Sequence, residues 1–124
     1  MTQENKKLTM VIGASPNPAR YSHLAVQSLA AHGHPVIAIG KRNGTIGSIT
    51  IQTNQPDIKG VDTATLYINP SLQSLYYDYL LSLHPRRIIF NPGTENKELE
   101  ILAKKNNIET LEACTLVLLS TEQY

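Results

Sequence analysis

Short apolar blocks, separated by longer mixed segments, run along the whole chain. Residues 8–14 are mostly apolar, which indicates a strand buried on both faces of a sheet. Comparable blocks rich in β-branched residues occur at 35–39, 63–68, 87–90 and 108–112. The pattern therefore predicts five strands. The first four are followed by Ser15–Pro16, Gly40, Asn69–Pro70 and Asn91–Pro92.

Between the first two predicted strands, the apolar residues follow the spacing of an α-helix. Residues 22–32 predict a helix capped at its start by Ser22, with the pair Asn17–Pro18 as an alternative start. Gly33 would end this helix by taking a positive φ. The side chains expected on its buried side are Leu24, Ala25, Leu29 and Ala30.

Two more helices are predicted further along the chain. Residues 71–83 carry a helical stripe of apolar residues, formed by Leu72, Leu75, Tyr76, Tyr79, Leu80 and Leu83. Residues 95–106 predict a second helix, with Thr94 as its cap. The apolar run in the tail, 114–124, fits a strand or a short helix, and we expect the helix.

The alternation of strands and helices predicts an α/β fold. We expect one domain over residues 1–124, built on a doubly wound, mainly parallel, five-stranded sheet with the strand order 3-2-1-4-5. The connection at 41–60 lacks helical periodicity, so it would be irregular or contain a hairpin.

Composition narrows the class of protein. The 124 residues are 41% hydrophobic and 17% charged with a formal net charge of +1, which is typical of a soluble globular protein and gives no sign of nucleic-acid binding. No apolar run approaches the roughly 20 residues that span a membrane. The polar start at 1–7 also differs from a signal peptide, so we expect a cytoplasmic protein.

The expected binding site lies where the predicted strands end. In an open α/β sheet, ligands bind outside the carboxyl ends of the strands at the switch point, expected here between the first and fourth strands. The loops after the first four strands supply the candidate cofactor-binding residues Gly13, Ala14, Ser15, Pro16, Asn17, Arg20, Tyr21, Gly40, Lys41, Arg42, Asn69, Pro70, Asn91, Pro92 and Gly93.

The first of these loops suits a phosphate. Gly13 permits close approach of the backbone, Ser15 adds a hydroxyl donor and Arg20 a positive charge near a helix start. The alternative is that glycine and proline here only turn the chain. The loop lacks the regular glycine fingerprint of NAD-binding proteins.

The loop after the second strand is basic. An NAD site usually has an acidic residue here for the ribose hydroxyls, whereas this chain has Lys41 and Arg42. Two cations favour an extra ribose phosphate, which both coenzyme A and NADP carry. Solvated surface charges are the alternative.

The segment VIGASPNPARYSHLAVQSLAAHGHPVIAIGKRNG, with the later INP and NPGTEN, resembles the small stand-alone CoA-binding proteins related to the N-terminal domain of the succinyl-CoA synthetase α subunit. The resemblance implies a Rossmann-like fold, with residues 13–18 holding cofactor phosphates and Lys41 and Arg42 facing the phosphorylated adenosine. The remaining cleft would be lined by Asn69, Pro70, Asn91, Pro92 and Gly93. The ligase reaction is not implied, because it needs a second domain carrying a phosphohistidine, before which this chain ends.

A catalytic set is not evident in the sequence. Cys114, the only cysteine, lies beside an apolar run, which favours a buried, inert thiol. The histidines show no metal-ligand spacing, and no Gly-x-Ser-x-Gly motif is present. We therefore expect a module that binds coenzyme A or an acyl-CoA and has no ligase chemistry. An NADP-binding oxidoreductase and an interaction module that binds no nucleotide stay open as alternatives, as do a protein partner and a homodimer.

Overall fold

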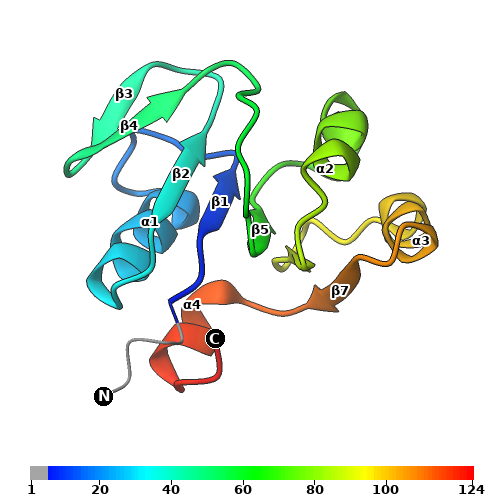
Figure 1. Cartoon of the computed structure of the whole chain (residues 1–124). Coiled ribbons are helices and arrows are strands. Elements are labelled where there is room, and N and C mark those ends of the chain that lie inside the picture. Colours follow the sequence, from blue (N-terminus) through cyan, green and yellow to red (C-terminus); the bar gives the residue numbers. More distant parts are fainter. Residues whose placement is uncertain (1–5) are drawn as a thin grey trace.

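The computed structural model describes residues 6–124, which form a single sheet with helices on both faces (Figure 1). The strands are β1 (Thr9–Ile12), β2 (Val36–Ile39), β3 (Gly44–Ile46), β4 (Ile49–Gln52), β5 (Thr63–Leu66), β6 (Arg87–Phe90) and β7 (Glu109–Glu112). The helices are α1 (Tyr21–Ala31), the 3-10 helix η1 (Pro70–Tyr76), α2 (Tyr77–Leu83), α3 (Lys97–Lys105) and α4 (Thr115–Ser120).

The sheet has the order β3-β4-β2-β1-β5-β6-β7, with β3 and β4 antiparallel and every other neighbouring pair parallel. The prediction of five strands is wrong, because the connection at 41–60 contains the β3–β4 hairpin and β4 joins the sheet beside β2. The parallel strands alone follow the order 3-2-1-4-5-6 once β4 is counted third. The switch point consequently lies between β1 and β5, not between β1 and the strand at 87–90.

Neighbouring residues of a strand point to opposite faces and so build two cores. Met10 and Ile12 of β1 join the core that packs under α2 and α3, whereas Val11 joins the core under α1 and α4. Figure 1 shows these two pairs of helices on opposite sides of the strands. Both faces of the central strands are therefore covered, which explains their near-continuous apolar sequence.

Helix α1 differs from expectation at its start. Its N-cap is Arg20, which makes no side-chain capping bond, so neither Ser22 nor Asn17 caps it. Ala25 and Leu29 are buried as predicted, whereas Leu24 is 39% exposed. Ala30 is also exposed, and the buried side of α1 is completed by Ser22, His23 and Val26. Gly33 has the positive φ predicted for the helix end, at 85°.

The helix predicted at 71–83 is in fact two helices of different kinds, η1 and α2. A 3-10 helix has three residues per turn, so residues three apart share a face. Gln73 and Tyr76 thereby turn inward, and Leu72 and Leu75 turn outward, 38% and 68% exposed. The prediction that both leucines are buried is wrong for this reason, while Tyr79, Leu80 and Leu83 are buried.

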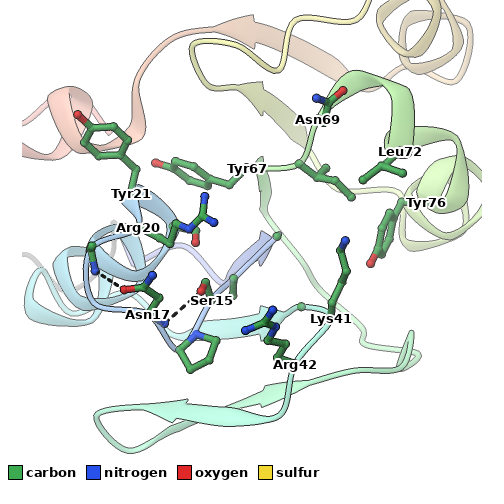
Figure 2. Close-up of a pocket in the computed structure, with 17 residues that line it drawn as sticks. Ser15, Asn17, Arg20, Tyr21, Lys41, Arg42, Tyr67, Asn69, Leu72 and Tyr76 are labelled. Atoms are coloured by element: carbon green, nitrogen blue, oxygen red, sulfur yellow. Dashed lines mark hydrogen bonds between the residues drawn. The ribbon is translucent and has the colours of Figure 1, made fainter.

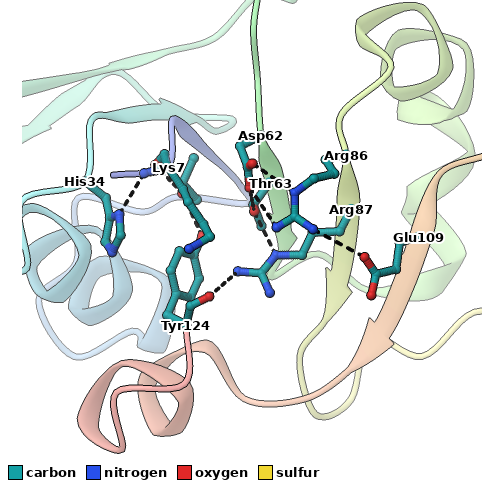
Figure 3. A network of polar contacts seen from close by, with 9 residues as sticks. Lys7, His34, Asp62, Thr63, Arg86, Arg87, Glu109 and Tyr124 are labelled. Carbon is teal, nitrogen blue, oxygen red and sulfur yellow. Dashed lines mark hydrogen bonds and ion pairs between the residues drawn. The ribbon is translucent and has the colours of Figure 1, made fainter. Parts of the chain in front are cut away.

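The tail forms the short helix α4, as predicted, and then reaches the amino-terminal edge of the sheet (Figure 3). The Tyr124 hydroxyl lies 2.6 Å from Thr9 Oγ1, and its ring lies 4.6 Å from the Arg87 guanidinium. Cys114, just before α4, is half-buried rather than buried. None of the helices in residues 6–124 is long and apolar enough to cross a membrane.

Candidate functional site

A cavity of about 710 Å³ opens at the carboxyl-terminal edge of the sheet (Figure 2). Its walls come from the segments that follow β1, β2 and β5, three strands that are adjacent in the sheet. Those segments meet here because parallel neighbours end at the same edge on either side of the switch point. The volume is within the usual range of about 300–1,000 Å³ for small-molecule sites.

Most of the candidate residues predicted from the sequence lie around this cavity. Those that line it are Gly13, Ala14, Ser15, Pro16, Asn17, Arg20, Tyr21, Gly40, Lys41, Arg42 and Asn69. Four other candidates, Pro70, Asn91, Pro92 and Gly93, are not among the lining residues. The structure therefore brings three of the four predicted loops together and leaves out the loop after β6.

Asn91 has a structural explanation for its position outside the cavity. Its amide nitrogen donates to Thr65 Oγ1 at 2.6 Å and to the Leu66 carbonyl at 2.9 Å. Its carbonyl oxygen accepts from the Thr115 backbone N–H at 2.8 Å. With its side chain buried and both ends hydrogen-bonded, Asn91 ties α4 to β5 instead of facing a ligand.

Several lining residues were not predicted. They are Ala19, Ser22, Tyr67, Ile68, Leu72 and Tyr76. Tyr67 and Ile68 follow β5, but the sequence predicts a strand over residues 63–68 that includes both of them. Leu72 and Tyr76 belong to the helical stripe that the sequence predicts to be buried. The predicted strand 63–68 has an ordinary length for a β-strand, so strand length gives no signal that β5 ends at Leu66.

The loop between β1 and α1 is held in shape by short-range hydrogen bonds. The Asn17 N–H donates to Ser15 Oγ at 3.1 Å, and the Ala19 N–H donates to Asn17 Oδ1 at 3.0 Å, as Figure 2 shows. The Gly13 and Ala14 N–H groups both donate to the Ile39 carbonyl of β2. These hydrogen bonds hold the first residues of the loop, Gly13 and Ala14, against β2, and they stabilise the turn at Asn17.

Glycine at position 40 allows this loop to sit against β2. A Cβ on Gly40 would come 2.1 Å from the Ala14 carbonyl oxygen, far closer than atoms can approach. Gly40 is buried and its N–H donates to Gln52 of β4. The floor of the cavity is therefore a close backbone-to-backbone contact that only glycine permits.

The charges around the cavity have one sign. Arg20, Lys41 and Arg42 line it, and its lining contains no aspartate or glutamate. Each of these three cations is exposed, and none forms an ion pair with an acidic residue in 6–124. In Figure 2, Arg20 lies on one side of Ser15, with Lys41 and Arg42 on the other. The cavity is therefore suited to a ligand with several negative charges.

Backbone donors are also available at the cavity. Ser15, Tyr21 and Ser22 line it, and their N–H groups make no backbone hydrogen bond within the described chain. Tyr21 and Ser22 lie in the first turn of α1, whose N-cap supplies no side-chain acceptor. The positive end of the helix dipole and unpaired N–H groups together form a common anion-binding arrangement.

The opposite wall is mainly apolar and aromatic. It includes Tyr67, Ile68, Leu72 and Tyr76. Burial raises the pKa of Tyr67, so its phenol is neutral at physiological pH. Among residues 6–124, His, Cys, Asp and Glu side chains form no group of three that could hold a metal ion. The arrangement can thus hold an anion on one side and an uncharged aromatic or aliphatic group on the other.

Comparison with known families gives a match over most of the chain. A family model described as "CoA binding domain" matches residues 7–120, a range that includes every residue lining the cavity. No curated protein matches the chain.

Solved structures also resemble the chain. One, described as the crystal structure of an uncharacterized protein, is 49% identical, with 96% of this chain and 98% of that chain covered and a TM-score of 0.94. A structure of cell-free ID.343 from Thermus thermophilus is 19% identical, with 98% and 92% covered and a TM-score of 0.84. A hypothetical protein from Pyrococcus horikoshii OT3 is 21% identical, with 92% and 82% covered and a TM-score of 0.82. At 19% and 21% identity, the likeness extends to the fold alone.

Proposed function

Because the chain belongs to the CoA-binding domain family, we propose that it binds coenzyme A or an acyl-CoA in the cavity at the carboxyl edge of its sheet. The observation that carries this proposal is a set of three cations that form no ion pair within residues 6–124, around a cavity whose described lining has no acidic residue. Coenzyme A carries a pyrophosphate and a ribose 3′-phosphate, so it supplies the negative charge that this lining lacks.

Different lining residues would bind the two phosphate-bearing parts of coenzyme A, the pyrophosphate and the ribose 3′-phosphate. Ser15, Arg20 and the first turn of α1 would hold the pyrophosphate, because N–H groups, a hydroxyl and a guanidinium converge there. Lys41 and Arg42, which follow β2, would receive the ribose phosphate. We propose binding alone, without ligase chemistry.

Calorimetry with coenzyme A and dephospho-CoA tests this assignment. We expect the wild type to bind dephospho-CoA about 10- to 100-fold more weakly, the worth of a charge-assisted contact. In the Lys41→Ala/Arg42→Ala variant, coenzyme A should bind as weakly as dephospho-CoA. The matched control is Lys97→Ala/Lys105→Ala, which removes two exposed cations from α3 and should leave both affinities unchanged.

NADP is the informative competitor, because its 2′-phosphate would also suit Lys41 and Arg42. Tight binding of NADP with no binding of coenzyme A would overturn the proposal in favour of a dinucleotide site. A melting temperature that does not move with any of these ligands at saturating concentration would favour an interaction module without a nucleotide, since ligands that bind the native state stabilise it.

A further inference from the structure

A buried histidine is hydrogen-bonded to the loop between β1 and α1. His23, in the first turn of α1, is 7% exposed and is not among the residues lining the cavity. Its Nδ1 lies 2.9 Å from the carbonyl oxygen of Ser15. A carbonyl oxygen can only accept, so Nδ1 carries the hydrogen and donates it.

This hydrogen bond has a special place in the loop. From Ser15 to Ala19, the other hydrogen bonds found within residues 6–124 join members of the segment 15–20 to one another. Pro16 and Pro18 have no N–H to donate. Among the hydrogen bonds found within residues 6–124, the bond from His23 is therefore the one that links residues 15–19 to α1.

Ser15 is the residue whose orientation this bond controls. Its Oγ accepts from the Asn17 N–H, and the residue itself lines the cavity between the cationic side chains. A rotation of the Ser15 peptide would break the turn at Asn17 and redirect the hydroxyl. Buried polar groups with a single partner fix such orientations because leaving them unpaired is costly.

We propose that His23 is a positioning residue for the anion-binding loop: it holds the Ser15 carbonyl and thereby keeps the segment 15–19 in the conformation that receives the ligand's phosphates. The inference rests on the proposed function and assigns His23 a role through Ser15, without ligand contact.

Three variants separate this role from a packing role. His23→Phe keeps a ring and removes the donor, whereas His23→Asn places an amide N–H near the position of Nδ1. His32→Phe is the matched control, because His32 also lies at an end of α1 with its Nδ1 2.8 Å from a carbonyl, that of Ser28, but is exposed and away from the cavity. We expect His23→Phe to weaken coenzyme A binding about tenfold, the equivalent of one uncompensated hydrogen bond. His23→Asn should recover most of that loss, and His32→Phe should show none.

A second measurement tests the positioning role of His23 in the absence of coenzyme A. In the ligand-free protein, NMR order parameters of the Ser15, Asn17 and Ala19 amides should fall in His23→Phe and recover in His23→Asn. Unchanged amides in His23→Phe, or equal affinity losses in the Phe and Asn variants, would overturn the positioning role. If the wild type failed to bind coenzyme A, the proposed function would be wrong, and the order parameters alone would then support or overturn the role of His23.

Discussion

Gly40 shows how one residue can decide the shape of the site. Its missing side chain lets the Ala14 carbonyl lie where a Cβ would be, so the floor of the cavity and the end of β2 are in direct backbone contact. Neither backbone can yield easily, because Ala14 donates to Ile39 and Gly40 donates to Gln52. The position couples the stability of the sheet to the placement of the binding loop.

Gly40→Ala should therefore impair both properties. We expect unfolding free energy to fall by about 1–3 kcal/mol, the usual cost of overpacking, and coenzyme A affinity to fall because residues 13–17 must move. Urea unfolding and calorimetry measure the two effects. Gly47→Ala is the control: its Cβ would meet nothing within 4 Å, although its φ of 62° strains any side chain. It should lose stability but retain affinity, and a Gly40→Ala variant with wild-type affinity would contradict the coupling.

Among the elements, η1 determines the wall opposite the cations. It carries Leu72 and Tyr76 into the cavity lining and is held by the buried side chain of Gln73. The Gln73 amide nitrogen donates to the carbonyls of Ile68 and Thr94, and its oxygen accepts from Asn96 Nδ2 at 2.9 Å. One residue thus fastens η1 both to the end of β5 and to the segment before α3.

Gln73→Leu keeps the size of this side chain and removes its hydrogen bonds. Because buried partners lose their bonds, we expect a loss of about 1–3 kcal/mol in unfolding free energy, together with weaker binding of coenzyme A. Gln55→Leu is a matched control, since the exposed Gln55 also donates to η1, at the Leu75 carbonyl, and should cost less than about 0.5 kcal/mol. Equal losses in the two variants would mean that Gln73 does not anchor η1.

The same elements show how far the sequence could predict the structure. Apolar blocks bounded by turn residues predict five of the parallel strands, β1, β2, β5, β6 and β7, and the loops after β1 and β2. These features depend on burial and on local turn chemistry, which the sequence shows directly. The β3–β4 hairpin is one of the two alternatives predicted for residues 41–60, but the sequence gives no sign that β4 joins the sheet, because its pairing with β2 is a tertiary contact. The apolar spacing of residues 71–83 fits an α-helix and does not indicate the 3-10 winding of η1, so Leu72 is predicted in the core although it is exposed at the cavity. Tyr76 packs against the core and also lines the cavity. Asn91 looked like a ligand residue because only the tertiary structure reveals its bonds to Thr65 and Thr115.

Across the whole molecule, the charged side chains differ between the carboxyl-terminal and amino-terminal ends of the strands. At the carboxyl edge, Arg20, Lys41 and Arg42 surround the cavity and form no ion pair within residues 6–124, whereas Arg86 and Arg87 at the amino edge bind other residues of the protein (Figure 3). There Arg86 pairs with Asp62 at 3.0 Å and with Glu109 at 3.4 Å, which links the starts of β5, β6 and β7. Changes at the amino edge should therefore alter stability and leave ligand binding intact.

Asp62 makes this separation testable through pH. Burial raises the pKa of Asp62, but hydrogen bonds from Arg86 and Thr63 outweigh burial and hold the pKa below its ordinary value of 3.8. The unfolded chain consequently binds a proton at a higher pH than the native protein. The stabilisation from the Asp62 carboxylate is therefore complete above the ordinary pKa and is lost as the pH falls below it.

In urea unfolding at a series of pH values, Asp62→Asn should lose less stability than the wild type as the pH falls below about 4. Asp57→Asn, at an exposed ion pair with Lys59, should follow the wild type, and coenzyme A affinity at neutral pH should be the same in all three proteins. A wild-type acid profile in Asp62→Asn would show that the Asp62–Arg86 pair adds no stability, and a changed affinity would show that the two edges are coupled.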